Sequence, residues 1–126
     1  MENNINWHDT TSVYVQALKG MPEYEQLSTS RKQFLETFIN LFIFEEYIRY
    51  TNKYFADKYL CSEKTIERYF SDLRKNKIIY QRVACPYYDG RYHTERTLWL
   101  DPVLRANIQL AAQNIKDIIN KSRGKK

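Results

Sequence analysis

The stretch that most limits the fold runs from residue 51 to 80, TNKYFADKYLCSEKTIERYFSDLRKNKIIY. Thr51 and Ser62 are residue types that cap helix N-termini, and each precedes a run with apolar residues at helical spacing. About three residues link the two expected helices, which leaves room only for a sharp turn. The inward face of the first helix is expected to hold Phe55, Ala56 and Tyr59.

The second expected helix, running to about Lys77, has one apolar face. Ile66, Phe70 and Leu73 are spaced by four and then three residues, so they form one stripe. Polar residues fall on the other faces: Lys64, Thr65, Arg68, Asp72 and Lys75. Two helices joined this closely, the second polar and basic outside, predict a helix-turn-helix.

The hydrophobic period changes from 3.6 to 2 directly after these helices. IIYQRVA (78–84) and RTLWL (96–100) are rich in β-branched and aromatic residues, which favours strands. Asp89-Gly90 between them is a turn signal. We predict a β-hairpin, or wing, with a long basic and tyrosine-rich tip: Arg82, Tyr87, Tyr88, Arg91, Tyr92, His93 and Arg96. The fold class is therefore mainly α with a β-hairpin, a winged helix-turn-helix.

Further elements are expected on both sides. In residues 1–27, an N-terminal arm, SVYVQAL could be a short strand, and Gly20-Met21-Pro22 is a breaker. Ser28 or Ser30 can then cap a core helix. Its apolar residues follow at helical spacing: Phe34, Leu35, Phe38, Leu41, Phe42 and Tyr47.

A last helix is expected over 101–122, before a basic tail at 123–126. Asp101 is a suitable N-cap, and Pro102 is tolerated at the first helical position. This helix carries an apolar seam with spacings of four and three: Leu104, Ile108, Ala111, Ile115 and Ile118. The seam either packs on its own domain or pairs two protomers. Leu110 and Ile119 widen the apolar surface, which favours a homodimer.

The chain length of 126 residues fits a single domain spanning 1–126, and 28–100 would hold the helix-turn-helix and wing. MENNINW lacks the features of a signal peptide, and FINLFIF is too short to span a bilayer. Cys61 and Cys85 are isolated and fit a reducing compartment. We expect a cytoplasmic protein without a membrane partner.

The net charge of +5 is unevenly distributed along the chain. Residues 1–50 carry −3, residues 51–77 carry +3, and residues 78–126 carry +5. A basic half joined to an acidic half favours a nucleic-acid partner.

The sequence offers no catalytic constellation. His8 and His93 stand alone, so no histidine pair is placed to hold a metal beside a nucleophilic tyrosine. The three glycines of the chain form no phosphate-binding loop. We expect no enzymatic activity, no metal and no cofactor.

Duplex DNA recognition needs side chains that reach base edges and cations that hold phosphates. Arg68 suits a bidentate contact with guanine, and Lys64 suits a phosphate. The predicted contacts on the recognition helix are Ser62, Lys64, Thr65, Arg68, Tyr69 and Lys75. The start of the preceding helix adds Asn52 and Lys53, and the wing adds Arg82, Arg91, Tyr92, His93 and Arg96.

Over roughly 12–101, the chain resembles the winged helix-turn-helix domains of replication initiators from plasmids and phages of low-GC Gram-positive bacteria, and related small regulators. The resemblance rests on the Phe55-Ala56 pair, the opening Ser62-Glu63-Lys64-Thr65-Ile66, and the closing Leu73 and Ile78-Ile79. Upstream, MPEYEQLSTSRKQFLETFINLF is similar to the family's entry segment. The resemblance implies binding of an origin or operator in a mobile element, in replication or in transcription regulation.

The sequence departs from this family at two turns. Leu60 stands where the family usually has glycine, which implies a left-handed backbone at a residue with a side chain. Lys77 replaces a second glycine, and Asn76 could take that conformation instead.

Two other functions remain open at this point. The chain could be a protein-interaction module that docks on a replication or host protein through its tyrosine-rich wing. It could also bind single-stranded nucleic acid by stacking tyrosines on bases.

Overall fold

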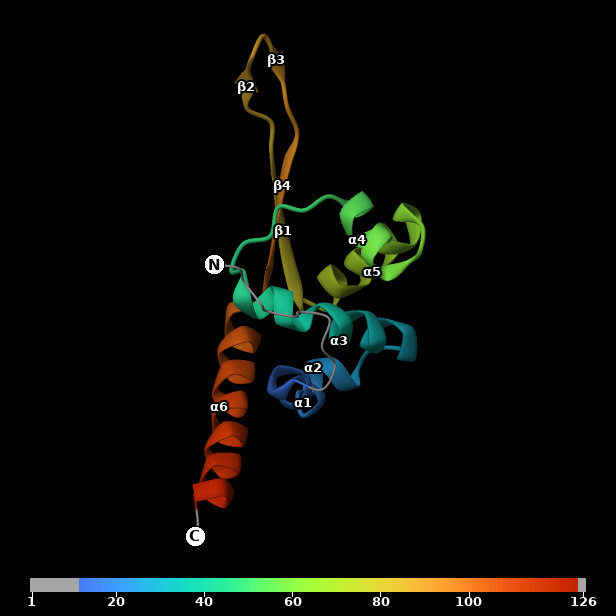
Figure 1. Ribbon diagram of the computed structural model, residues 1–126. Helices are drawn as coiled ribbons and strands as arrows, with labels where there is room; N and C mark the ends of the chain where they lie inside the picture. Colours follow the sequence, from blue (N-terminus) through green and yellow to red (C-terminus); the bar gives the residue numbers. More distant parts are fainter. Residues whose placement is uncertain (1–11, 125–126) are drawn as a thin grey trace. The chain divides into compact units, whose positions relative to one another are not determined.

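The computed structural model describes residues 12–124 (Figure 1). Backbone contacts divide the chain into two compact units. The first comprises residues up to Phe44 and from Pro102 onward, and the second is Glu45–Asp101. The elements are mainly helices with one β-hairpin, which confirms the expected fold class. The single domain expected from chain length stays a prediction.

The first unit contains four helices in its described part: α1 (Val13–Lys19), α2 (Pro22–Glu25), α3 (Thr29–Phe44) and α6 (Pro102–Gly124). α1 packs against both α3 and α6. The Ser12 hydroxyl accepts a hydrogen bond from the Val15 amide at 3.2 Å, which caps α1. The same hydroxyl donates to the buried Asn40 side chain at 2.8 Å, which ties the start of α1 to α3.

The aromatic face expected for α3 is buried, as predicted, through Phe34, Leu35, Phe38, Leu41 and Phe42. Two other expectations were wrong. SVYVQAL is helical rather than a strand, because Ser12 caps it and Val15 and Leu18 fall on one buried helical face. Tyr47 lies beyond the end of α3 and is 56% exposed.

The second unit begins with a non-helical segment, residues 45–50, in which Ile48 forms one β-bridge with the hairpin. The Ile48 amide donates to the Leu98 carbonyl, and the Leu98 amide donates to the Ile48 carbonyl, both at 2.8 Å. This antiparallel pairing explains why Tyr47 is not helical, since tertiary contacts override a helical pattern at its end.

The helix-turn-helix consists of α4 (Asn52–Tyr59) and α5 (Glu63–Lys75), as predicted. Thr51 accepts from the Tyr54 amide and Ser62 from the Thr65 amide, both at 3.1 Å, so both expected N-caps are confirmed. The stripe Ile66, Phe70 and Leu73 is fully buried. The helices meet through an edge-to-face contact of Phe55 and Phe70, with ring centroids 5.0 Å apart.

Both turns at which the sequence departs from glycine adopt left-handed backbone. Leu60 has a φ of 59° and Lys77 a φ of 60°. The suggestion that Asn76 takes this conformation was wrong, because its φ is −88° and its side chain bonds the Asp72 carbonyl at 2.8 Å. The Ile78 amide instead reaches the Leu73 carbonyl at 2.9 Å, which is the bonding of a Schellman helix end.

The hairpin has a stem and a tip. In the stem, β1 (Ile79–Ala84) pairs antiparallel with β4 (Glu95–Leu100), and at the tip β2 (Tyr87–Tyr88) pairs with β3 (Arg91–Tyr92). Asp89 and Gly90 form the two-residue turn, with φ of 53° and 78°, so the predicted turn is confirmed.

α6 begins at Pro102, as expected, and runs to Gly124, two residues past the predicted end. Residues 1–11, including His8 and MENNINW, and the end of the basic tail lie outside the described residues. Between residues 12 and 124, no helix is long and apolar enough to cross a membrane.

Candidate nucleic-acid interface

The outer face of α5 presents a row of cationic side chains. Lys64, Arg68 and Lys75 are spaced by four and seven residues, so they form one stripe opposite the buried one. All are exposed. Within the described part of the chain, none of the three side chains makes a hydrogen bond or ion pair. The predicted cationic residues of this helix therefore lie together on one accessible surface.

The other predicted contacts on α5 are partly occupied. The Ser62 hydroxyl caps the helix and lies 3.0 Å from the Thr65 hydroxyl. Tyr69 is half-buried on a flank of α5, where its ring meets Tyr59 edge-on with centroids 6.2 Å apart. These residues border the cationic row.

A polar network lies on the opposite flank of α5. Arg96 of β4 donates to the side-chain oxygen of Asn52 and, at 2.7 Å, to the Tyr50 carbonyl. Asn52 donates to Glu67 at 3.2 Å, and Arg74 donates to the same carboxylate at 3.2 Å. Arg74 also reaches Gln81 of β1 at 3.1 Å. The network links the stem of the wing to both helices.

Arg96 is half-buried in this network. Its guanidinium lies 5.4 Å from the centre of the Phe70 ring. Burial lowers the pKa of Arg96, while the nearby Glu67 carboxylate acts in the opposite direction. The guanidinium remains charged, because an arginine pKa starts far above neutrality.

Two residues predicted to touch DNA at the start of α4 thus bond to the protein itself. Asn52 uses both ends of its amide in the network. Lys53 pairs with Asp57 at 3.3 Å, but both side chains are exposed, so this pair is weak and leaves Lys53 accessible.

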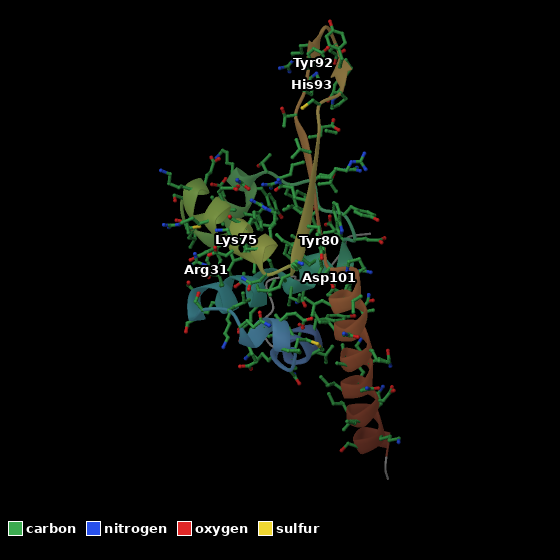
Figure 2. All side chains as sticks on the ribbon, turned by 180° about the vertical axis from the view of Figure 1, so that it is seen from behind. Arg31, Lys75, Tyr80, Tyr92, His93 and Asp101 are labelled. Carbon is green, nitrogen blue, oxygen red and sulfur yellow. The ribbon has the colours of Figure 1, made fainter. Side chains whose placement is uncertain are left out.

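The tip of the wing holds Arg91, Tyr92 and His93, as expected (Figure 2). Tyr92 is 73% exposed, and its ring meets Tyr87 with centroids 4.9 Å apart. The His93 ring stacks on Tyr88 at 3.7 Å, and its Nε2 lies 3.0 Å from the Tyr88 carbonyl oxygen. The tip therefore consists of paired strands that carry an aromatic surface.

The placement of Arg82 and Arg96 at the tip was wrong, because both lie in the stem. Arg82 pairs with Thr97, and Arg96 pairs with Val83. Successive side chains of a strand point to opposite faces, so Arg82 and Arg96 lie on opposite faces of the stem. The alternation of side chains in RTLWL could have shown that Arg96 points inward, since Arg96 shares its face of the strand with the buried Leu98 and Leu100.

The predicted seam of α6 is divided by its packing. Leu104 and Ile108 are fully buried by their own chain, so a second protomer could not reach them. Ala111 and Ile115 are half-buried, and Ile118 is 68% exposed. The sequence pattern did not single out Ala112, which is 1% exposed. Dimerisation stays a prediction that would have to use the outer part of the helix.

The described residues contain no cluster of His, Cys, Asp or Glu that could hold a metal ion. No protein-family model and no curated protein matches the chain. Among solved structures, the chain is similar to a "possible transcriptional regulator" from Methanosarcina mazei Go1, with 16% identity and a TM-score of 0.44. The match covers 87% of this chain and 82% of that chain. The fold assignment rests on the elements described above and not on this likeness.

Proposed function

We propose that this chain is a small winged-helix protein that binds double-stranded DNA sequence-specifically. α5 enters the major groove, and the wing tip contacts phosphates or an adjacent minor groove. We further propose that it acts in a mobile element, in replication or transcription regulation, as the family resemblance implies. The observation that carries the proposal is the accessible cationic row on α5.

The three side chains of this row are of the types that contact bases and phosphates in a DNA groove. Arg68 lies in its middle, and a planar guanidinium can bond both acceptors of guanine. Lys64 and Lys75 lie on either side of it and suit phosphate contacts. Each such contact makes binding dependent on salt, because it releases counterions from the DNA.

Glu67, an acidic residue on the wing-side flank of this row, is engaged by other groups of the protein. Glu67 is paired with Arg74 and accepts a further hydrogen bond from Asn52. Its charge is therefore compensated on the wing side of α5. This arrangement supports a role of the network in holding α5 and the wing in one geometry.

The wing tip supports a second contact with the duplex. Arg91 and Tyr92 are exposed at the tight Asp89-Gly90 turn, and His93 is held by its stack on Tyr88. An arginine at a narrow hairpin tip suits a minor groove, whose negative potential attracts cations.

A homodimer would read two half-sites about one helical turn apart. Exposed apolar residues on the outer side of α6 support this part of the proposal, namely Val103, Leu110 and Ile118. We place the contact on this outer surface, because Leu104 and Ile108 are buried within the chain.

A second candidate function is docking on a replication or host protein through the wing. Tyr87 and Tyr92 are 62% and 73% exposed, and exposed tyrosines are common anchors of protein interfaces. Such a module would bind duplex DNA weakly and without sequence preference.

The test is selection from a random duplex pool at about 200 mM salt, followed by sequencing of the retained DNA. Enrichment of a motif with two inverted half-sites would support duplex recognition and the dimer together. Finding that motif at an origin or an operator would separate replication from regulation. A pool without enrichment would reject sequence-specific binding and favour the docking module.

A further inference from the structure

One face of the stem carries a row of aromatic rings. Tyr80 of β1 pairs with Trp99 of β4, and their rings stack with centroids 6.2 Å apart. Because Ile48 bridges Leu98 in antiparallel fashion, Tyr47 falls beside Trp99, and these rings lie 6.0 Å apart edge-on. The row therefore runs from β1 across β4 to the segment that Ile48 joins to β4.

Tyr80 is held in place at one end of this row. Its hydroxyl bonds the Asp101 carboxylate, and this bond raises the pKa of Tyr80. Figure 2 shows Tyr80 and Asp101 together at the base of the hairpin, far from Tyr92 and His93 at the tip. Tyr47 at the other end is 56% exposed, so the row combines a fixed ring with an accessible one.

The next row on the same face is cationic. Arg82 pairs with Thr97, and Arg49 reaches the Thr97 hydroxyl with its Nε at 3.5 Å. Adjacent strands lie about 5 Å apart, so the two arginine backbones are about 10 Å apart with Thr97 between them. The Arg82 side chain makes no hydrogen bond or ion pair with any residue between 12 and 124.

The arginine row, together with Tyr47 and Trp99 of the aromatic row, lines a hollow of about 460 Å³ on this face. Its remaining lining is Ala84 and Glu95, at the tip side of the arginine row. Glu95 accepts a hydrogen bond from Tyr88 at 3.3 Å, which engages its carboxylate with the tip. A hollow of this size lies within the range that holds a small organic ligand.

We propose that this hollow is a second nucleic-acid site, which binds an unpaired DNA strand. A base stacks on the Tyr47 and Trp99 rings, and the adjoining phosphodiester lies over Thr97 between Arg49 and Arg82. Stacking platforms beside cations are the usual means of holding single strands. A duplex does not fit, because paired bases hide their flat faces inside the stack.

This site is distinct from the duplex surface proposed above. Arg49 and Tyr47 lie on the face of the stem opposite Arg96, and Arg96 bonds the start of α4. The side chains of the hollow fit any single strand that carries bases and phosphates. The choice of DNA as that strand rests on the proposed duplex function.

The test uses the full chain with Trp7→Phe, which leaves Trp99 as its one tryptophan. Trp99 emission is titrated with a single-stranded oligothymidylate of about ten nucleotides at low salt. The same titration uses an abasic strand of equal length, an oligouridylate and an acidic peptide. Tyr47→Ala and Arg49→Ala are introduced separately on this background. Lys58→Ala, which also removes an exposed cation from this unit, serves as the matched control.

We expect the oligothymidylate to quench Trp99, and the abasic strand to bind at least about fivefold more weakly. Tyr47→Ala should weaken binding by a similar factor, Arg49→Ala should reduce the salt dependence, and Lys58→Ala should change neither. Absence of quenching, equal binding of the abasic strand, or stronger binding of the acidic peptide or RNA would each overturn the proposal.

Duplex binding is measured on the same variants, so the two proposals can fail separately. Quenching by the single strand without any duplex selection would reject the proposed function alone. Duplex selection that Arg49→Ala leaves intact, together with no quenching, would reject the second site alone.

Discussion

Arg96 of the wing donates a hydrogen bond to the side chain of Asn52, the first residue of α4. Through Asn52 the contact continues to Glu67 on α5. The stem of the wing is thus bonded to both helices of the helix-turn-helix. Arg96 therefore supports the fold from within, and its predicted contact with DNA stays a prediction.

Replacing Arg96 with alanine should destabilise the protein by about 1–3 kcal/mol, because it leaves Asn52 and the Tyr50 carbonyl without their donor. Urea denaturation followed by circular dichroism measures the loss. Arg91→Ala at the exposed tip is the matched control and should stay within about 0.5 kcal/mol. Equal stability of the two variants would contradict a supporting role for Arg96.

Leu60→Gly should stabilise the protein by about 0.5–1 kcal/mol. Leu60 is 90% exposed and has a φ of 59°, so its side chain contributes strain and little packing. Glycine removes that strain but adds some entropy to the unfolded chain. Thermal unfolding measures the change, and Leu60→Ala, which keeps a Cβ, should be nearly neutral. A destabilised glycine variant would show that the Leu60 side chain has a packing role.

The helix-turn-helix was predictable because local signals agree there. Thr51 and Ser62 are caps, and the stripe from Ile66 to Leu73 matches the helical period. The Asp89-Gly90 turn was predictable for the same reason, since few sequences favour two consecutive left-handed residues.

The roles of individual cations were not predictable in the same way. Arg68 and Arg96 are both arginines in basic segments, yet one is exposed and the other is bonded to Asn52 and Tyr50. That difference depends on strand register and on contacts between residues 44 positions apart. The pairing of residues 45–50 with β4 was missed for a related reason, because a long-range bridge decides it.

If α6 joins two protomers, Ile118→Glu should shift the protein toward monomer at concentrations where it is otherwise dimeric. Ile118 is 68% exposed, so the substitution should leave the fold of one chain intact. Sedimentation equilibrium measures the shift, and the control is Gln109→Glu, which adds the same charge at an exposed position on the other side of α6. An unchanged association constant for Ile118→Glu, or a protein that is monomeric throughout, would reject dimerisation through this surface.

Alkaline pH should weaken the first unit through Tyr24. Burial and a hydrogen bond to Glu36 raise the pKa of Tyr24 to about 12 from its ordinary value of 10.0. The folded state therefore favours the neutral phenol. Its stabilising contribution is complete below pH 10 and disappears as the pH rises toward 12.

The free energy of unfolding of Tyr24→Phe should accordingly be about 1–2 kcal/mol lower than that of the parent protein at pH 8, because the variant lacks the hydrogen bond to the Glu36 carboxylate. Its stability should then fall less steeply than that of the parent between about pH 10 and 12. Denaturant unfolding at several pH values measures both the loss of stability at pH 8 and the slope of stability against pH. Tyr92→Phe, at an exposed tip position, should follow the parent curve. Parallel curves for Tyr24→Phe and the parent would rule out this linkage.

The two kinds of cation in the α5 row should have different effects on DNA binding. Arg68→Ala should reduce the binding free energy for the selected DNA site by about 1–3 kcal/mol and relax the base preference at one position. Lys75→Ala should weaken binding uniformly across sequences and reduce the log-log salt slope by about one. Repeating the duplex selection and the salt titration on each variant separates these effects. The contrary outcome is that both variants weaken binding to all DNA sequences equally. In that case α5 would contact the DNA backbone without contacting base edges, and specificity would have to come from DNA shape.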